Sequence, residues 1–253
     1  MTLEPPAEAT HSRWEMGQGD AVDFLQTFAT DAVDVICTDP PYNLGQYSTG
    51  NISLPWRKTL NNDVADWDAG DFDPHFVAEE FQRILSPTGN LFIFTSYNLV
   101  GVWHSLLDDV FDTFQFAVWH KTNPPPKVFR AGFLNSCELI VCAWNKGHVW
   151  NFEKQIEMHN FFESPVCGGR ERLKDPHHPT QKPVSVLKWL LRKGTQPGAL
   201  VVDPFAGVGS TGVAALELGC RFAGIERDKD YALASIRRLE QTSNELASRL
   251  PFE

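Results

Sequence analysis

Residues 201–212 read Val-Val-Asp-Pro-Phe-Ala-Gly-Val-Gly-Ser-Thr-Gly, an apolar strand that runs into a glycine-rich turn at the start of a helix. Gly207, Gly209 and Gly212 satisfy the G-x-G-x-x-G spacing, in which glycines permit a tight turn and bring backbone N–H groups close to a ligand. The same spacing also occurs in ordinary strand-to-helix turns. The stretch therefore predicts an α/β fold with a candidate ligand site at this turn.

The next apolar strand supports a ligand, because residues 221–225 are followed by Glu226. An acid at the tip of the second strand can accept hydrogen bonds from ribose hydroxyls, which favours an adenosine-containing ligand. A dinucleotide and S-adenosylmethionine are the two alternatives. A dinucleotide usually needs a second nucleotide-binding half, and only the helical segment 228–249 follows Glu226. The missing half argues against a dehydrogenase.

A second motif follows residues 33–38, whose sequence Val-Asp-Val-Ile-Cys-Thr predicts a buried strand. Directly after it stands Asp39-Pro40-Pro41-Tyr42, where two prolines force the chain to turn. The turn places an acid, carbonyl groups and an aromatic ring at the carboxyl end of a strand, where open α/β sheets bind their ligands. A Pro-Pro corner with a packed tyrosine is the structural alternative. The tetrapeptide is a candidate active site.

Together the two motifs resemble those of the amino-group DNA methyltransferases. Their order, with Asp-Pro-Pro-Tyr before the glycine motif, resembles the permuted β class of that family. The resemblance spans most of the chain and leaves only the segment 148–175 without a motif that can be assigned. The further motifs that carry it are His178-Pro179-Thr180-Gln181-Lys182-Pro183, Gly224-Ile225-Glu226, Tyr231 and Arg237.

This resemblance implies the transfer of a methyl group from S-adenosyl-L-methionine to the exocyclic amine of a flipped-out DNA base. The residues that it assigns to catalysis are Asp39, Pro40, Pro41 and Tyr42. The residues that it assigns to cofactor binding are Asp20, Thr180, Lys182, Pro183, Asp203, Pro204, Phe205, Ala206, Gly207, Gly209, Ser210, Thr211 and Glu226.

The chemistry explains these residue types. An exocyclic amine is a poor nucleophile because its lone pair is delocalised into the ring, so acceptors must localise that pair as the methyl is attacked. The Asp39 carboxylate and the Pro40 carbonyl are suitable acceptors, and Tyr42 can stack on the base. Asp39 needs no raised pKa, because methylation makes the amine far more acidic before its proton leaves. In-line positioning would provide much of the rate.

The target base follows less directly. The resemblance favours adenine, because relatives with Asp at the first position of the tetrapeptide mostly modify adenine, whereas Ser is more common among those that modify the cytosine amine. The cytosine amine stays open, as does a catalytically inactive regulator that binds cofactor or DNA. A ring-carbon cytosine methyltransferase needs a nucleophilic Cys, which in those enzymes follows Pro, and this sequence has no Pro-Cys dipeptide.

We expect a single Rossmann-like α/β domain over residues 11–253, with a mostly parallel sheet, helices on both faces and a circularly permuted motif order. The C-terminal part of the chain offers only two strands for the cofactor half, at 200–203 and 221–226. The third strand of that half must therefore come from residues 13–20. Asp20 would then stand at the tip of that strand near the adenine, although Asp before a helix is also a common N-cap. Residues 1–10 predict a disordered tail.

Hydrophobic periodicity predicts the remaining elements. The helices are expected at 21–28, 75–85, 99–108 and 184–193, and a turn at 86–89 closes the second of them. Further strands are expected at 90–95, 114–119 and 137–144. Two long polar connections, 43–72 and 121–135, are typical of functional or mobile loops.

The net charge of −10 conceals a basic middle segment. Residues 120–193 hold 12 Lys and Arg against 6 Asp and Glu, with His, Trp and Phe between them, as in a nucleic-acid surface. The family places its target recognition segment here, and we assign it to an insertion at 145–177. The partner is then double-stranded DNA, with a homodimer and a cognate restriction endonuclease left open. The candidate DNA contacts, in irregular parts where we expect no competing core role, are Lys127, Arg130, Arg170, Arg172 and Lys174.

The five cysteines form no C-x-x-C pair and predict reduced structural thiols. A zinc site at Cys167, His177 and His178 is disfavoured, because two adjacent histidines cannot easily share one tetrahedral metal, and we expect no metal ion. The sequence has no apolar stretch that approaches the length of a membrane span and no basic-then-apolar leader. These features predict a cytoplasmic protein.

Overall fold

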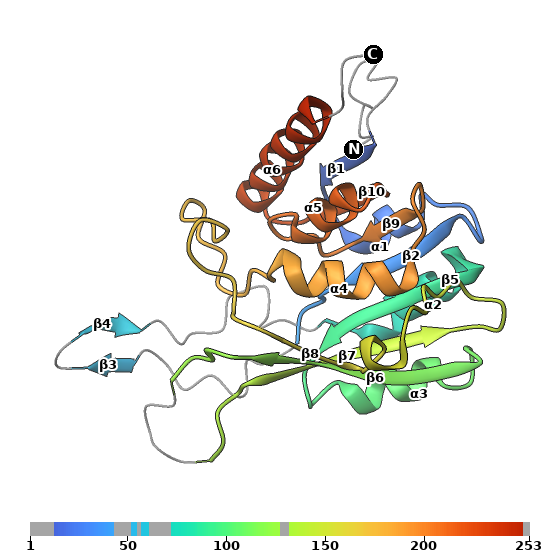
Figure 1. Cartoon of the computed structure of the whole chain (residues 1–253), viewed down its shortest axis with the longest axis horizontal. Coiled ribbons are helices and arrows are strands. Elements are labelled where there is room, and N and C mark those ends of the chain that lie inside the picture. The colour runs from blue at the N-terminus through green and yellow to red at the C-terminus, as the bar shows by residue number, and fades with distance from the viewer. Residues whose placement is uncertain (1–12, 43–51, 55–56, 61–71, 127–131, 250–253) are drawn as a thin grey trace.

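A computed structural model of the protein describes residues 13–42, 52–54, 57–60, 72–126 and 132–249. One eight-stranded sheet of order β1-β10-β9-β2-β5-β7-β6-β8 forms its centre, with helices against both faces (Figure 1). The expected tail at 1–10, most of the 43–72 connection, and the predicted DNA contacts Lys127 and Arg130 lie outside the described residues.

The cofactor half of the sheet is built from both ends of the chain. β9 (Leu200–Asp203) pairs in parallel with β10 (Arg221–Glu226), and β10 pairs in parallel with β1 (Trp14–Gln18). The N-terminal strand therefore supplies the third strand of this half, as predicted. The permuted order of the motifs is a real property of the topology.

The other half begins with β2 (Val33–Thr38), which pairs in parallel with β9 and with β5 (Leu85–Thr95). β7 (Cys137–Trp144) runs antiparallel between β5 and β6 (Thr113–Lys121). A short strand, β8 (Phe161–Ser164), closes the edge in parallel with β6. The sheet is therefore mostly parallel, and β1, β10, β9, β2 and β5 all end at the same edge.

The prediction of a turn at 86–89 is wrong. β5 begins at Leu85, directly after the helix, because Leu85 pairs with Val33 and Asn90 pairs with Val35. The residues between these two pairings form an irregularity within the strand. Ser, Pro, Thr and Gly at these positions gave a turn signal that the strand accommodates as a bulge.

Helices cover both faces of the sheet (Figure 1). α4 (Val184–Gly194), α5 (Ser210–Glu217) and α6 (Lys229–Ser248) share one buried cluster, which includes Val35 and Cys37 of β2. α1 (Ala21–Leu25), α2 (Pro74–Ile84) and α3 (Val100–Leu107) share the other, which includes Ile36. Successive residues of β2 thus pack on opposite faces, as expected for a strand covered on both sides. α1 is shorter than the 21–28 predicted.

The insertion at 145–177 does not form one unit. Its first part, before the short 3-10 helix η2 (Gln155–Glu157), packs at the C-terminal end of α4, where Asn151 donates its backbone N–H to the Lys193 carbonyl at 2.8 Å. β8 follows, and Lys121 and Thr122 then lie beside Ser164 at the carboxyl end of β6. Only the part after β8 therefore lies on the side of the predicted active site.

All five cysteines lie among the described residues and are unpaired, four of them buried. Within the described ranges, none of the helices is both long enough and apolar enough to cross a membrane.

Candidate active site

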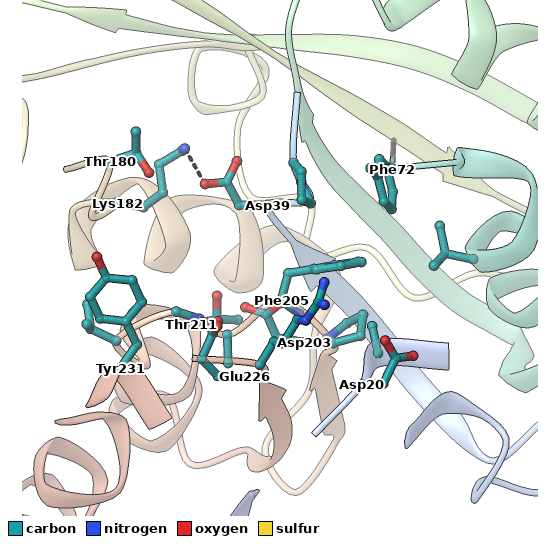
Figure 2. Close-up of a pocket in the computed structure, with 18 of the residues that line it drawn as sticks. Asp20, Asp39, Phe72, Thr180, Lys182, Asp203, Phe205, Thr211, Glu226 and Tyr231 are labelled. Carbon is teal, nitrogen blue, oxygen red and sulfur yellow. Dashed lines mark hydrogen bonds and ion pairs between the residues drawn. The ribbon is translucent and has the colours of Figure 1, made fainter. Parts of the chain in front are cut away.

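The carboxyl ends of β2, β9 and β10, the turn after β1 and the start of α2 surround a cavity of about 430 Å³. Figure 2 shows Asp39 and Lys182 facing each other on one side of this cavity, with Thr211 and Glu226 across from them. The two motifs are far apart in the sequence. They meet here because parallel strands end at one edge of the sheet.

Asp39 follows directly after β2 and presents both carboxylate oxygens to neighbours. The Tyr42 hydroxyl donates to Oδ1 at 2.6 Å, and the Lys182 ammonium donates to Oδ2. Asn98 donates its side-chain amide to the Tyr42 carbonyl at 2.8 Å, which holds the corner against the segment after β5. An ionised carboxylate has about four lone-pair sites, so sites remain for a ligand N–H.

Lys182 binds the Asp39 corner and also lines the cavity. Its side chain is 7% exposed, and its ammonium also lies 3.3 Å from Glu138 Oε2. Burial by itself lowers the pKa of Lys182, but the Asp39 and Glu138 carboxylates more than offset this and raise it. Burial raises the pKa of Asp39, and Lys182 opposes that rise without cancelling it. Asp39 thus has a raised pKa, which the sequence analysis did not require for the reaction.

Asp203, at the end of β9, fixes the floor of the site. Its Oδ1 accepts the Thr38 hydroxyl at 2.7 Å and the Phe205 backbone N–H at 3.0 Å, which ties β2 to the glycine turn. Burial raises the pKa of Asp203 to about 6. Both of these hydrogen bonds are to the protein itself, so Asp203 shapes the site as well as lining it.

The glycine turn needs its glycines for two different reasons. Gly207 and Gly209 have φ values of 51° and 78°, which favour glycine. A Cβ on Gly207 would lie 3.2 Å from His178 Nε2, a group that lines the cavity. A Cβ on Gly209 would lie 2.3 Å from Ser235 Oγ on α6. Gly209 therefore serves the packing of the turn on α6.

Glu226 stands at the tip of β10, as predicted for a ribose-binding acid. Its Oε2 accepts the Gly207 N–H at 2.9 Å, and its Oε1 accepts the Asp228 N–H at 2.8 Å. These two bonds fix the carboxylate and leave lone pairs for hydroxyl donors. The Gly207 N–H is consequently engaged by Glu226, although the glycine spacing had predicted backbone N–H groups that face a ligand.

Several residues in or beside the cavity wall were assigned no role from the sequence. Phe72 packs edge-on against Phe205 with ring centroids 5.4 Å apart, and Phe76 follows at the start of α2. The Asp73-Pro74 helix start was the available cue, because it places this helix N-terminus at the sheet edge. His178 and Tyr231 pack with ring centroids 4.5 Å apart, and burial lowers the pKa of His178 to about 4. Glu138 offered only a charge at the start of an apolar run.

The lining suits a cationic adenosine ligand. The acidic lining residues are Asp20, Asp39, Asp73, Asp203 and Glu226, and the basic ones among the described residues are Lys182 and Arg227. S-adenosylmethionine carries a sulfonium, an ammonium and a carboxylate, so its net positive charge fits this balance. Its hydroxyls match the fixed Glu226 carboxylate, and the Gly207 turn leaves the space that a side chain would fill.

Most of the residues predicted for the cofactor reach this cavity. Those that line it are Asp20, Thr180, Lys182, Asp203, Pro204, Phe205, Ala206, Gly207, Ser210, Thr211 and Glu226. Asp20 also caps α1, accepting the Val22 N–H at 2.8 Å. Among the described residues, Gly209 and Pro183 do not line the cavity. Of the predicted catalytic residues, Asp39 and Pro41 line it, whereas Pro40 and Tyr42 stand beside it.

The predicted DNA contacts that the structure describes lie in the irregular segment after β8. Arg170 and Lys174 are exposed there. Arg172 instead donates to the His178 and Pro179 carbonyls at 3.3 and 3.0 Å, and it also contacts Cys167 and His177. Arg172 therefore holds this loop together through its guanidinium, and its assignment as a DNA contact stays a prediction.

Comparisons with known proteins agree with this geometry. A family model described as DNA methylase, N6_N4_Mtase, matches residues 33–237. The Type II methyltransferase M2.MboI of Moraxella bovis is 28% identical over 260 residues, covering 95% of this chain and 93% of that protein. The Type II methyltransferase M2.DpnII of Streptococcus pneumoniae is 32% identical over 240 residues, covering 87% of each.

Solved structures show the same fold. The M1.HpyAVI–SAM complex superposes with a TM-score of 0.65 at 25% identity, covering 89% of this chain and 100% of that chain. The PvuII DNA methyltransferase, described as cytosine-N4-specific, has a TM-score of 0.63 at 16% identity, covering 94% and 95%. The fold therefore also occurs in a methyltransferase described as specific for the cytosine amine.

Proposed function

Because this chain belongs to the N6_N4_Mtase family of DNA methylases, we propose that it transfers a methyl group from S-adenosyl-L-methionine to the exocyclic amine of adenine in DNA. The observation that carries this assignment is the Asp39 carboxylate, fixed by Tyr42 and Lys182 at the wall of an acid-lined cavity. Asp39, Pro40, Pro41 and Tyr42 are the proposed catalytic residues.

The cofactor, when bound, supplies an electrophilic methyl group on a sulfonium. We assign its binding to the turn at Gly207, to Glu226 for its hydroxyls, and to the cavity wall between Thr180 and Lys182. The acidic lining favours its positive charge. The residues of this chain bind and orient the target amine and accept its proton.

The Asp39 carboxylate and the Pro40 carbonyl accept hydrogen bonds from the two N–H groups of the target amine. These bonds localise the lone pair of the amine toward the methyl group. As the N–C bond forms, the C–S bond breaks and the sulfur keeps its electron pair. The amine nitrogen then gives up a proton, which Asp39 accepts and releases to water. Tyr42 stacks on the base, which has to leave the duplex because its amine is unreachable within it.

Adenine is the proposed base because the tetrapeptide starts with Asp. The cytosine amine is the second candidate, since one structural neighbour with the same fold is described as cytosine-N4-specific. We further propose double-stranded DNA as the substrate, read by the segment after β8, and the cytoplasm as the place of action. The two relatives named Type II methyltransferases support site-specific methylation alongside a restriction endonuclease. A homodimer stays a prediction, and light scattering of the purified protein would measure its mass in solution.

The test is methylation of unmodified plasmid DNA by the purified protein with labelled S-adenosylmethionine, followed by mass spectrometry of the nucleosides and long-read sequencing. N6-methyladenine at one sequence motif is expected. N4-methylcytosine would correct the base, and no methylated nucleoside would exclude the enzymatic function. Asp39→Ala should abolish labelling while calorimetry still detects cofactor binding. Turnover of Asp39→Ala comparable to that of the unmodified protein would contradict the catalytic assignment.

A further inference from the structure

A row of four alternating charges runs inward from the sheet to the catalytic corner. Lys121 ends β6, Glu138 is the second residue of β7, Lys182 precedes α4, and Asp39 follows β2. Lys121 Nζ lies 2.6 Å from Glu138 Oε1, Lys182 Nζ lies 3.3 Å from Glu138 Oε2, and Lys182 also binds Asp39. Four separate elements therefore converge on one charge network.

Glu138 is placed to act on Lys182 and is kept away from the ligand. Its side chain is 17% exposed, and among the described residues it is not part of the cavity wall. Its two oxygens are divided between two ammonium groups. Burial by itself raises the pKa of Glu138, but Lys182 and Lys121 more than offset this and lower it. The two ammonium groups thus favour the ionised form of Glu138 behind the catalytic corner.

This arrangement answers a charge problem at the site. A buried ammonium needs a carboxylate partner, and breaking a buried pair is strongly destabilising. Asp39 is the nearest partner of Lys182, yet the proposed reaction requires lone pairs of Asp39 for the target amine. Glu138 gives Lys182 a second carboxylate, so that Lys182 stays in place while Asp39 engages the base.

We propose that Glu138 is a positioning residue for methyl transfer, which holds the Lys182 ammonium against Asp39 Oδ2 and so aims the remaining lone pairs of Asp39 at the target amine. This inference rests on the proposed function. Lys182 also steadies the corner through the Tyr42 hydroxyl at 3.4 Å, and its ammonium lies 5.5 Å from the centre of the Tyr42 ring. Misplacement of the corner should therefore affect rate more than cofactor affinity.

The charges that face Asp39 set the expected pH dependence. Lys182 and the hydrogen bond from Tyr42 lower the pKa of Asp39, whereas Glu138 raises it, and Asp203 of β9 and Cys37 of β2 are further titratable groups that interact electrostatically with it. Removal of the Lys182 charge leaves burial and Glu138 opposed by the Tyr42 hydrogen bond but no longer by the Lys182 ammonium. The acid limb of the rate profile should then move to higher pH in Lys182→Met.

The test is a double-mutant cycle of Glu138→Gln, Lys182→Met and the pair, read by the single-turnover methylation rate and by the dissociation constant of S-adenosylmethionine. Glu138→Gln should slow the chemical step roughly tenfold to hundredfold, as expected for a misplaced reacting group, with cofactor affinity changed less than about threefold. If Glu138 acts through Lys182, the pair should be no slower than Lys182→Met alone. Glu217→Gln, which removes the carboxylate of the outer Lys188–Glu217 pair, is the matched control.

A second readout separates this inference from the proposed function. The Lys182 ammonium should give a slowly exchanging ¹⁵N signal, which Glu138→Gln should abolish and Glu217→Gln should keep. Multiplicative rate losses in the cycle, or a retained signal, would overturn the role of Glu138 in an active enzyme. Absence of methylation by the unmodified protein would instead overturn the proposed function, and the signal would still report whether Glu138 holds Lys182. If Glu138→Gln does not fold, Glu138→Asp enters the same cycle.

Discussion

At the residue scale, Tyr42 combines two interactions that substitution can separate. Its ring is proposed to stack on the base, which is worth about 1 to 3 kcal/mol, and its hydroxyl donates to Asp39 at 2.6 Å. Tyr42→Ala should therefore weaken DNA binding by roughly 5-fold to 150-fold, the equivalent of that energy. Tyr42→Phe should retain DNA affinity and lose rate, because the ring is kept while the contacts of the hydroxyl with Asp39 and Lys182 are removed.

Gel-shift affinities and single-turnover rates of the two Tyr42 variants make this distinction, and Tyr42→Trp serves as the control that keeps a stacking surface. Equal losses of DNA affinity in all three variants would assign the tyrosine's contribution to its hydroxyl.

His178 should give the protein a pH-dependent stability. Burial lowers its pKa to about 4, below the ordinary value near 6.5, so the unfolded chain binds the proton more readily than the folded one. Its contribution is present above pH 6.5 and is lost as the pH falls toward 4. Between about pH 7 and pH 5 the loss is about 2 kcal/mol of unfolding free energy.

Urea unfolding at the two pH values measures this loss. His178→Gln should remove about that much of the pH dependence, whereas the exposed His159→Gln should retain it. An unchanged dependence in His178→Gln would show that His178 protonates without penalty in the folded protein.

At the element scale, the two positive-φ glycines of the turn should respond differently to substitution. Gly209→Ala places a Cβ against Ser235 of α6 and should destabilise the fold by about 1 to 3 kcal/mol. Gly207→Ala is also strained, but its Cβ points at His178 in the cavity wall, so it should in addition weaken cofactor binding. Thermal unfolding measures the stability of both variants, and calorimetry measures their affinity for the cofactor. If the two variants lost cofactor affinity in the same proportion to the stability lost, the proposed difference between Gly207 and Gly209 would be contradicted.

The segment after β8 should contribute to DNA binding through its exposed side chains. Arg170→Ala and Lys174→Ala should each lower the log–log salt slope of DNA affinity by roughly 0.9 if each contacts one phosphate. Arg172→Ala should mainly loosen the loop, because Arg172 binds the carbonyls of His178 and Pro179. Titrations at several salt concentrations measure the slopes, and unchanged slopes for Arg170 and Lys174 would place DNA on another surface.

At the scale of the whole molecule, the sequence predicted the sheet core and the permuted order well. Strong apolar runs such as 33–38 and the glycine turn after 200–203 are local signals, and strand β1 followed from counting what the cofactor half lacked. β8 was missed because its pairing partner in β6 lies far away in sequence, and the strand residues 85–89 were missed because Ser, Pro, Thr and Gly gave a turn signal there.

The residues of the candidate site also divide into those with a local sequence signal and those without one. Asp39, Glu226 and the turn carry motifs and were predicted as candidates, and their roles stay predictions until measured. Glu138 and Lys121 carry none. Their importance comes from the register of β6 and β7, which places the ends of two strands behind Lys182. A charge network assembled from four elements leaves no spacing in the sequence that could reveal it.

The pairing of β1 with β10 also has a consequence for folding during synthesis on the ribosome. A ribosome adds about 5 to 20 residues per second, so the N-terminal strand emerges roughly ten seconds or more before the strand that it pairs with. Neither the glycine turn nor Glu226 exists until the ribosome has passed residue 226. A nascent chain therefore carries Asp39 long before it can hold a methyl donor, and truncated products of interrupted translation should be inert.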